Sequence, residues 1–343
     1  MRSWRPESLS HRRANLNVRG RVLGAIRDFF AENGFVEVDT PALQVSPGLE
    51  PHLQAFGTVL HDPDSAALPR YLHTSPEFAM KKLLAGGMER IWQLAHVFRD
   101  GERGETHHPE FAMIEWYRAG ASYRDIMADS EALLRRVQDA AGVAAFRRHA
   151  EGADARQPWH YLSVAEAFET LAGIDLLGTV PDPGRPDAVL LADAAGTAGI
   201  AAHDGDDWET LFFRILLDRI EPKLGIGVPT ILYDYPLAQA ALARRKPEDP
   251  RLAERFELYV CGVELANAFG ELTDAVEQRA RFEVDRRKKQ ALYGESYPID
   301  EDFLAALEHG LPECAGIALG FDRLVMLAAG AEHIEDVLWL PVR

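Results

Sequence analysis

Cysteine is almost absent from this sequence. The 343 residues include two, Cys261 and Cys314, which lie far apart and have no Cys/His ligand spacing around them. This scarcity excludes a disulfide framework and a cysteine-based zinc site. We expect both residues to be small, buried side chains.

Long apolar runs are also missing. No stretch approaches the roughly 18 apolar residues that a membrane-spanning helix needs. The opening segment, MRSWRPESLSHRR, carries charges but no apolar region of the kind found in signal peptides. The sequence therefore predicts a soluble, cytoplasmic protein without a membrane partner.

Basic residues are outnumbered. The chain has 37 Lys and Arg against 54 Asp and Glu, a formal net charge of -17. Proteins whose main partner is nucleic acid need clustered basic residues to neutralise phosphates, so this balance argues against that class. Two short basic runs, at 244–246 and 286–289, remain candidates for docking a partner. Such runs are more often simply solvated.

The common nucleotide and nucleophile motifs are absent as well. The sequence has no Walker A pattern, no glycine-rich dinucleotide fingerprint, no Ser/His/Asp arrangement at recognisable spacing and neither class I synthetase signature. Its hydrophobic content of 47% allows a sizeable core, either in two or three domains or in one large domain with an insertion. Any nucleotide site must be built from charge and position instead.

The most informative stretch is 91–117, where two alternating apolar runs flank a polar loop. Alternation places two sets of side chains on shared faces: Gln93, Ala95, Val97 and Arg99, then Phe111, Met113, Glu115 and Tyr117. An arginine at a strand end, histidines in the loop and an aromatic residue after it suit a ligand with phosphates and a planar base. The alternative is an ordinary surface hairpin.

A second informative stretch is FELYVCGVELANAFGELTD, residues 256–274. Glu257 and Glu264 become cross-strand partners if a tight turn is centred at 260–261. Two like charges facing each other need a cation, and Mg²⁺ bridging phosphates is the natural one. Alternatively, both side chains splay into solvent. Glu271 shares their face only if a bulge or turn occurs near 267–268.

The remaining pattern predicts helices and strands around these stretches. We expect helices at about 15–33, 122–145 and 209–224, and strands at 35–38 and 229–233. A strand end, a Ser-Pro-Glu turn and an amphipathic helix follow at 71–86. The interval 146–210 is weakly patterned, and we interpret it as a probable insertion.

Three stretches, in the right order, resemble the motifs of class II aminoacyl-tRNA synthetases. GFVEVDTPAL, with Pro41, is similar to motif 1, FRDGERGETHHPEFAMIEWY to motif 2, and GIALGFDRLVML to motif 3. The ending HHPEF-x-M-x-E-x-Y resembles lysyl-tRNA synthetases in particular. The resemblance implies one α+β catalytic domain over 1–343, an antiparallel sheet flanked by helices, and a homodimer formed through motif 1.

The resemblance also implies an ATP site and a mechanism. Arg99 would contact the α-phosphate and the substrate carboxylate, Arg323 the γ-phosphate of a bent ATP, and Phe111 the adenine. The implied ATP-binding set is Arg99, Asp100, Gly101, Glu102, His107, His108, Phe111, Glu264, Leu265, Gly320 and Arg323. Glu257 and Glu264 would hold Mg²⁺. The family usually reads Arg-x-Glu in motif 2, whereas this chain reads Arg99-Asp100-Gly101-Glu102, so we expect Glu102 in that role.

The amino-acid pocket follows from the same resemblance. Its implied residues are Ser75, Pro76, Glu77, Glu115, Tyr117, Asn267, Phe269, Glu271 and Ala318. Several carboxylates around a small pocket select a diamine, with Glu77 facing the amine near the carboxylate and Glu271 the terminal amine. Ala318 stands where lysyl-tRNA synthetases carry glycine. Its methyl group is expected to crowd an α-amino acid and to favour a β-amino acid.

One feature separates the chain from lysyl-tRNA synthetases. Only some fifteen residues precede the first predicted helix, where those enzymes place an anticodon-binding barrel. With its acidic balance, the chain therefore resembles the elongation factor P lysine ligases. That family activates (R)-β-lysine, made by a lysine 2,3-aminomutase, with ATP and Mg²⁺, and transfers it to a lysine of elongation factor P without reading a tRNA anticodon.

Two other functions remain open at this stage. A truncated synthetase could charge a tRNA with lysine, which a basic surface beside the active site would favour. A catalytically inactive paralogue could act as a regulatory subunit, although the intact Arg99, Arg323, Glu257 and Glu264 argue against it.

Overall fold

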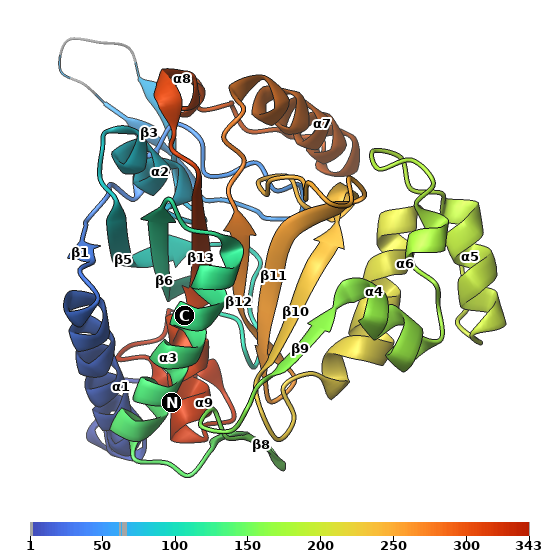
Figure 1. Cartoon of the computed structure of the whole chain (residues 1–343). Helices are drawn as coiled ribbons and strands as arrows, with labels where there is room; N and C mark the ends of the chain where they lie inside the picture. The colour runs from blue at the N-terminus through green and yellow to red at the C-terminus, as the bar shows by residue number, and fades with distance from the viewer. Residues whose placement is uncertain (1–2, 62, 64–66, 343) are drawn as a thin grey trace.

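The computed structural model describes residues 3–61, 63 and 67–342. An eight-stranded sheet forms its centre, in the order β1-β5-β6-β13-β12-β11-β10-β9 (Figure 1). In chain order these strands are β1 (Val36–Glu37), β5 (Arg90–Phe98), β6 (Glu110–Ala119), β9 (His160–Ser163), β10 (Thr230–Pro236), β11 (Leu252–Val260), β12 (Val263–Gly270) and β13 (Cys314–Gly320). All neighbouring pairs are antiparallel except β1 with β5 and β10 with β9. The predicted α+β class is confirmed.

Three helices cover one face of the sheet and build the largest core with it (Figure 1). They are α1 (Pro6–Glu32), α3 (Tyr123–Ala141) and α9 (Phe321–Ala329). Ser122 caps α3 through a reciprocal bond with Asp125, and Gly142, at φ 73°, ends it four residues before the predicted limit. The first helix begins earlier than predicted because its N-terminal turns carry few apolar residues for a periodicity to reveal.

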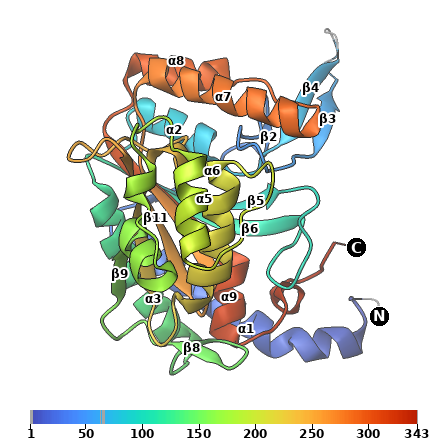
Figure 2. The same ribbon diagram turned by 90° about the vertical axis from the view of Figure 1, so that its right-hand side faces the viewer.

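A second group of helices packs at the other end of the sheet, and Figure 2 shows two of them along one edge of the molecule. It comprises α2 (Glu77–Ala85), α7 (Ala275–Tyr293) and α8 (Glu301–Gly310), with a small sheet of β2 (Leu43–Gln44), β3 (Gly57–Leu60) and β4 (Leu68–Leu72). Phe78 of α2 stacks on Phe303 of α8 with ring centroids 4.5 Å apart. This contact fixes the helix that follows the Ser-Pro-Glu turn.

A helical module with its own core lies beside the outer strands (Figure 1). Its segments are α4 (Val164–Ala167), η1 (Phe168–Ala172), η2 (Leu177–Thr179), α5 (Ala188–Thr197), α6 (Trp208–Ile215), η3 (Leu216–Ile220) and η4 (Glu221–Lys223). Phe212 stacks on Phe168 and Trp208, while Tyr235 and Tyr259 of the large sheet join the same core. The helix expected at 209–224 is an α-helix only in its first part, α6; a wider π turn, η3, and a tighter 3-10 turn, η4, follow. The assignment of 146–210 as an insertion stays a prediction.

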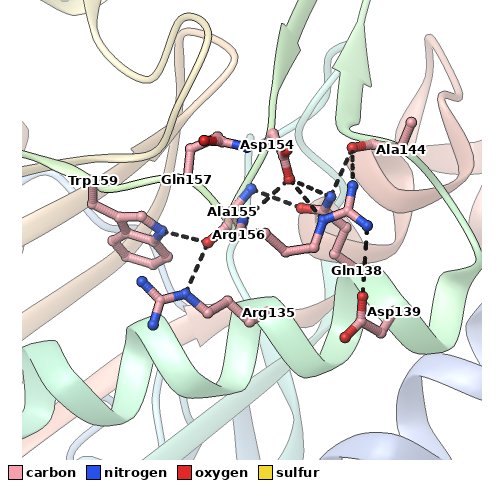
Figure 3. A network of polar contacts seen from close by, with 9 residues as sticks. All are labelled: Arg135, Gln138, Asp139, Ala144, Asp154, Ala155, Arg156, Gln157 and Trp159. Atoms are coloured by element: carbon pink, nitrogen blue, oxygen red, sulfur yellow. Dashed lines mark hydrogen bonds and ion pairs between the residues drawn. The ribbon is translucent and has the colours of Figure 1, made fainter.

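Before this module, the chain forms the hairpin β7 (Phe146–Arg148) and β8 (Glu151–Ala153) and is tied to α3 by the polar network of Figure 3. The fully buried amide of Gln138 donates to Ala144 O at 2.8 Å and to Asp154 Oδ1 at 2.7 Å. Its oxygen accepts from Ala155 N at 2.7 Å. The Gln138 amide therefore bonds a carbonyl, a carboxylate and a backbone N–H that lie on both sides of the hairpin, outside its strands.

The two cysteines lie in the core, and basic residues of both runs pair with carboxylates. Cys261 and Cys314 are both buried and unpaired, as predicted. Arg244 pairs with Glu254 at 2.7 Å, and the Lys288 ammonium pairs with Glu209. In the described part of the chain, no helix is long and apolar enough to cross a bilayer. Two short 3-10 turns complete the secondary structure: η5 (Leu237–Gln239) follows β10, and η6 (Ile334–Val337) follows α9.

We expect Gln138→Leu to destabilise the fold by about 1–3 kcal/mol, because it leaves the buried Ala155 N–H without an acceptor. Chemical denaturation measures the free energy of unfolding. Asp139→Ala is the matched control, because the neighbouring Asp139 makes only an exposed 3.9 Å ion pair with Arg156 and should change stability by less than about 0.5 kcal/mol. Equal losses in both variants would contradict the role given to Gln138.

Candidate active site

A cavity of about 450 Å³ opens on the sheet face opposite α1, α3 and α9. Along β6, Met113 turns toward this cavity while Ala112 and Ile114 enter the core beneath those helices. Most residues predicted for the site line it: Ser75, Glu77, Arg99, Glu102, His107, His108, Phe111, Glu264, Leu265, Asn267, Phe269, Ala318, Gly320 and Arg323. The volume is of the size usual for small-ligand sites.

Seven predicted residues do not reach the cavity wall. Pro76 precedes α2, and Asp100 and Gly101 form a turn in which the Asp100 carboxylate accepts from Gly101 N at 2.9 Å. Glu115, Tyr117, Glu257 and Glu271 lie buried behind the wall. Glu102 does line it, with Oε1 3.8 Å from Arg99 Nη1. Its role as the shifted motif 2 glutamate stays a prediction.

Arg99 stands at the end of β5 with donors still available. Its guanidinium lies 5.2 Å from the centroid of the Phe111 ring. Its Nε is buried and has no hydrogen-bond acceptor among the described residues. A buried cationic donor without an acceptor is suited to an anion such as a phosphate or a carboxylate.

Arg323 joins the start of α9 to the loop between β5 and β6. Its Nη1 donates to Glu264 O at 2.7 Å, its Nε to Thr106 O at 3.2 Å and its Nη2 to His107 Nε2 at 2.8 Å. Burial and the Arg323 charge lower the pKa of His107, which suits the neutral ring that accepts this bond. His108, which is also buried, accepts from Val342 N through Nε2 and donates from Nδ1 to Glu110 O.

The turn between β11 and β12 corrects one prediction. The chain reverses one residue later than expected, at Cys261 and Gly262, which have φ values of 54° and 69°. A bulge then pairs Tyr259 with Glu264 and leaves Leu265 outside the ladder. Glu257 and Glu264 are therefore not direct cross-strand partners, and the prediction that they are was wrong.

The same bulge resolves the orientation of Glu271. One extra residue at Leu265 restores the alternation, so Glu264, Asn267 and Glu271 face the same side of β12. Such a bulge was required by the sequence argument but was expected near 267–268. A single-sequence pattern cannot locate a bulge within a run of small apolar residues.

The two predicted metal ligands are in different situations. Glu257 Oε1 pairs with Arg255 at 2.5 Å, and its Oε2 accepts from the hydroxyls of Tyr235 and Tyr259. Glu264 lines the cavity, and burial together with the Glu257 charge raises its pKa. Glu264 therefore fits a divalent cation, whereas both oxygens of Glu257 already have protein partners, and the role of Glu257 as a metal ligand stays a prediction. Among the described residues, no group of three or more His, Cys, Asp or Glu side chains is arranged so that it could hold a metal ion.

Next to the cavity lies a buried cluster of carboxylates around a single lysine, with Glu77 as its member on the cavity wall. The Lys81 ammonium is 2.5 Å from Glu77 Oε1 and 2.5 Å from Glu271 Oε2. Glu115 accepts from Ser75 Oγ at 2.5 Å and from Tyr117 OH at 2.7 Å. Within the described structure, Glu271 Oε1 has no hydrogen-bond partner. We call Lys81, Glu77, Glu115 and Glu271 the carboxylate cluster.

Electrostatics mark this cluster as short of positive charge. Burial, with the charge of Glu77, raises the pKa of Glu115 to about 8. Burial also raises the pKa of Glu271, although Lys81 opposes the shift. Burial opposes the charge on Lys81, but Glu271 and Glu77 outweigh it and raise its pKa. Clusters whose pKa values are displaced in this way are typical of binding and catalytic sites.

Several residues of the site escaped the sequence argument, among them Glu50, Lys81, Phe213 and Arg255. Lys81 follows Glu77 by four residues on a predicted helix, a spacing that does signal a pair. Phe213 comes from the helical module, whose pattern pointed to no site. Gly316 was also missed: an added Cβ there would lie 2.2 Å from the Tyr117 ring, so only glycine lets that ring lie against β13.

Comparisons with known proteins agree with this geometry. Residues 7–343 match the family model for class II tRNA synthetases (D, K and N). The chain is 43% identical over 340 residues to an elongation factor P–(R)-β-lysine ligase of Pectobacterium carotovorum subsp. carotovorum (strain PC1), covering 98% of this chain and 96% of the relative. It is 42% identical to the ligase of that name from Sodalis glossinidius (strain morsitans), with the same two coverages.

A third relative of the same name, from Vibrio cholerae serotype O1 (strain ATCC 39315 / El Tor Inaba N16961), is 41% identical over 331 residues, covering 96% of this chain and 95% of the relative. The family-model match, over residues 7–343, spans all three motifs and every residue that lines the cavity. The chain belongs to the class II tRNA synthetase family and, within it, to the elongation factor P–(R)-β-lysine ligases.

Proposed function

We propose that this protein activates (R)-β-lysine with ATP as an adenylate and transfers it to a lysine side chain of elongation factor P. The observation that carries this proposal is the carboxylate cluster at one end of a cavity whose other end presents arginines. A cluster of three glutamates and one lysine calls for a ligand with two ammonium groups. A diamino acid such as β-lysine has both.

The first step requires the enzyme to hold the two reactants in position, and it needs no nucleophilic side chain. The substrate carboxylate attacks the α-phosphorus of ATP, forming a carboxyl–phosphate bond while pyrophosphate leaves. Arg99, whose Nε has no acceptor among the described residues, would hold the carboxylate and the α-phosphate together, and Arg323 would bind the outer phosphates. In the second step the acceptor lysine amine attacks the activated carbonyl, an amide forms and AMP leaves.

Mg²⁺ would be held by Glu264 and by phosphate oxygens, a ligand set that this ion commonly takes. Bound there, the ion would neutralise charge on the phosphates. Glu257 would be the second protein ligand, with Arg255 and two tyrosines orienting its oxygens. Phe111 would stack on adenine, and Leu265 and Gly320 would lie close to the nucleotide.

The preference for a β-amino acid would come from Ala318. It pairs with Asn267 on one side and Glu115 on the other, and its methyl group lines the cavity between the two ends. An α-amino acid carries its amine on the carbon next to the carboxylate, where this methyl would crowd it. We also propose a cytoplasmic homodimer, with (R)-β-lysine supplied by a lysine 2,3-aminomutase.

Arg99→Ala and Arg323→Ala should each lower ATP–pyrophosphate exchange by at least ~10²-fold, because each removes a charge-assisted contact to phosphate. The exchange is measured with (R)-β-lysine at saturating Mg²⁺. Arg103→Ala is the control, since Arg103 lies on the same loop but pairs with Glu335 at 3.6 Å. A folded Arg99 or Arg323 variant with near wild-type exchange would rule out this site.

The KM for (R)-β-lysine should fall as pH rises from about 6.5 to 8. In the free enzyme Glu115, with its pKa raised to about 8, holds a proton below that pH, and the substrate ammonium groups must displace it. The change can reach about tenfold per pH unit for each proton displaced. Steady-state exchange gives KM, and calorimetry in two buffers detects the released proton. A KM that does not vary over this range would contradict the assignment.

The acceptor is tested by competition. Labelled (R)-β-lysine is incubated with ATP, Mg²⁺, purified elongation factor P and bulk tRNA, and label should appear on the protein. Elongation factor P with its acceptor lysine replaced by arginine serves as the control and should stay unlabelled. Label found mainly on tRNA would favour the truncated-synthetase function instead.

A further inference from the structure

Lys81 is a buried charge to which the proposed reaction gives no role. It lies on α2, is 1% exposed, and its ammonium touches a carboxylate of its own helix and one from the end of β12. A buried ion pair rarely adds net stability, because desolvation offsets the attraction. Its presence at the amino-acid end of the cavity therefore calls for a reason other than stability.

The charges around Lys81 give that reason. The carboxylate cluster contains three acids, Glu77, Glu115 and Glu271, and one cation, so its full ionisation leaves two negative charges uncompensated. Of the other charged groups facing it, Glu50 lies beside Glu77 on the cavity wall, and Arg99 opposes Glu50. Two ammonium groups on one ligand would complete the cluster.

We infer that Lys81 is a positioning residue that sets the specificity of this pocket: it holds Glu77 and Glu271 in place and leaves the cluster two positive charges short, the number that a diamino acid carries. This inference rests on the proposed function, since it assumes that the cavity accepts an amino acid. Without Lys81 the same glutamates would lack three charges, and one of them would keep a proton or swing away.

Geometry separates this role from plain helix stabilisation. Exposed Glu and Lys residues four apart on a helix contribute only a few tenths of a kcal/mol. Here the lysine reaches past its helix neighbour to Glu271, whose Oε1 has no other partner among the described residues. That free oxygen lies near Tyr117, since both sit within 3 Å of a Cβ added at Gly316. The orphaned acceptor is where a terminal ammonium would bind.

The test is a double-mutant cycle with Lys81→Met and Glu115→Gln. Lys81→Met leaves the cluster short of three charges, and Glu115→Gln leaves it short of one. The double variant is again short of two. Each single variant should raise KM for (R)-β-lysine by at least about 30-fold in pyrophosphate exchange, with kcat and KM for ATP changing little.

Compensation is the decisive readout. The double variant should bind (R)-β-lysine at least about tenfold more tightly than Lys81→Met alone, although it lacks two native groups. A purely structural lysine predicts the opposite, with the two losses multiplying, and that result would overturn the inference. Lys82→Met is the matched control: Lys82 is the next residue on α2, pairs with Asp300 at 2.8 Å, and should leave KM unchanged.

If Lys81→Met does not fold, Glu115→Gln alone still tests the charge count. Its preference for (R)-β-lysine over 3-aminohexanoic acid, which lacks the terminal amine, should drop at least about tenfold from wild type. An unchanged preference would overturn the inference. If the wild-type enzyme supports pyrophosphate exchange with no diamino acid at all, the proposed function fails. If the wild-type enzyme does support exchange with (R)-β-lysine but the two mutations have additive effects, only the role of Lys81 fails.

Discussion

The buried carboxylate of Asp322 connects helices α1 and α9 with strand β6. It is 1% exposed, accepts from Ala112 N on β6 at 2.7 Å and pairs with Arg19 of α1, whose guanidinium also lies over the Phe321 ring. A buried carboxylate without these partners would be strongly destabilising. Because Arg323 is the next residue, the interaction that holds α1, β6 and α9 together also fixes the direction of that side chain into the cavity.

Electrostatics divide the cavity into two ends that need different ligands. At the phosphate end, burial and the neighbouring carboxylates raise the pKa of Glu264, and they raise that of Glu221 to about 7. At the amine end, the carboxylate cluster shows the same excess of negative charge. Arg99 lies between the two with a donor unpaired. Under the proposed function, a divalent metal ion bound with the nucleotide at one end and a diamine at the other would supply the positive charge that the protein itself lacks.

The sequence predicted the class, the family and most of the cavity wall because these depend on local patterns. Strand alternation placed Phe111 and Met113 on one face, and the structure pairs them with Val97 and Ala95, which alternation had placed together on one face of the preceding strand. The predicted register between β11 and β12 was wrong. The bulge at Leu265 depends on packing between strands, which cannot be read from a single sequence. Glu115 and Glu271 were found by resemblance, but the burial of both and the pairing of Glu271 with Lys81 arise only when α2 packs against the sheet.

The same burial explains how a site of this kind can discriminate by charge rather than by shape alone. In a water-filled pocket, an unused carboxylate costs little, so a ligand with one ammonium group would bind almost as well as one with two. In the carboxylate cluster, an acid left without a cation must take up a proton or remain a buried, unpaired charge, as the pKa of Glu115 near 8 indicates. A ligand that lacks its terminal ammonium leaves that cost in place. The burial of Glu271 thus turns the number of charges on the substrate into a difference in binding free energy.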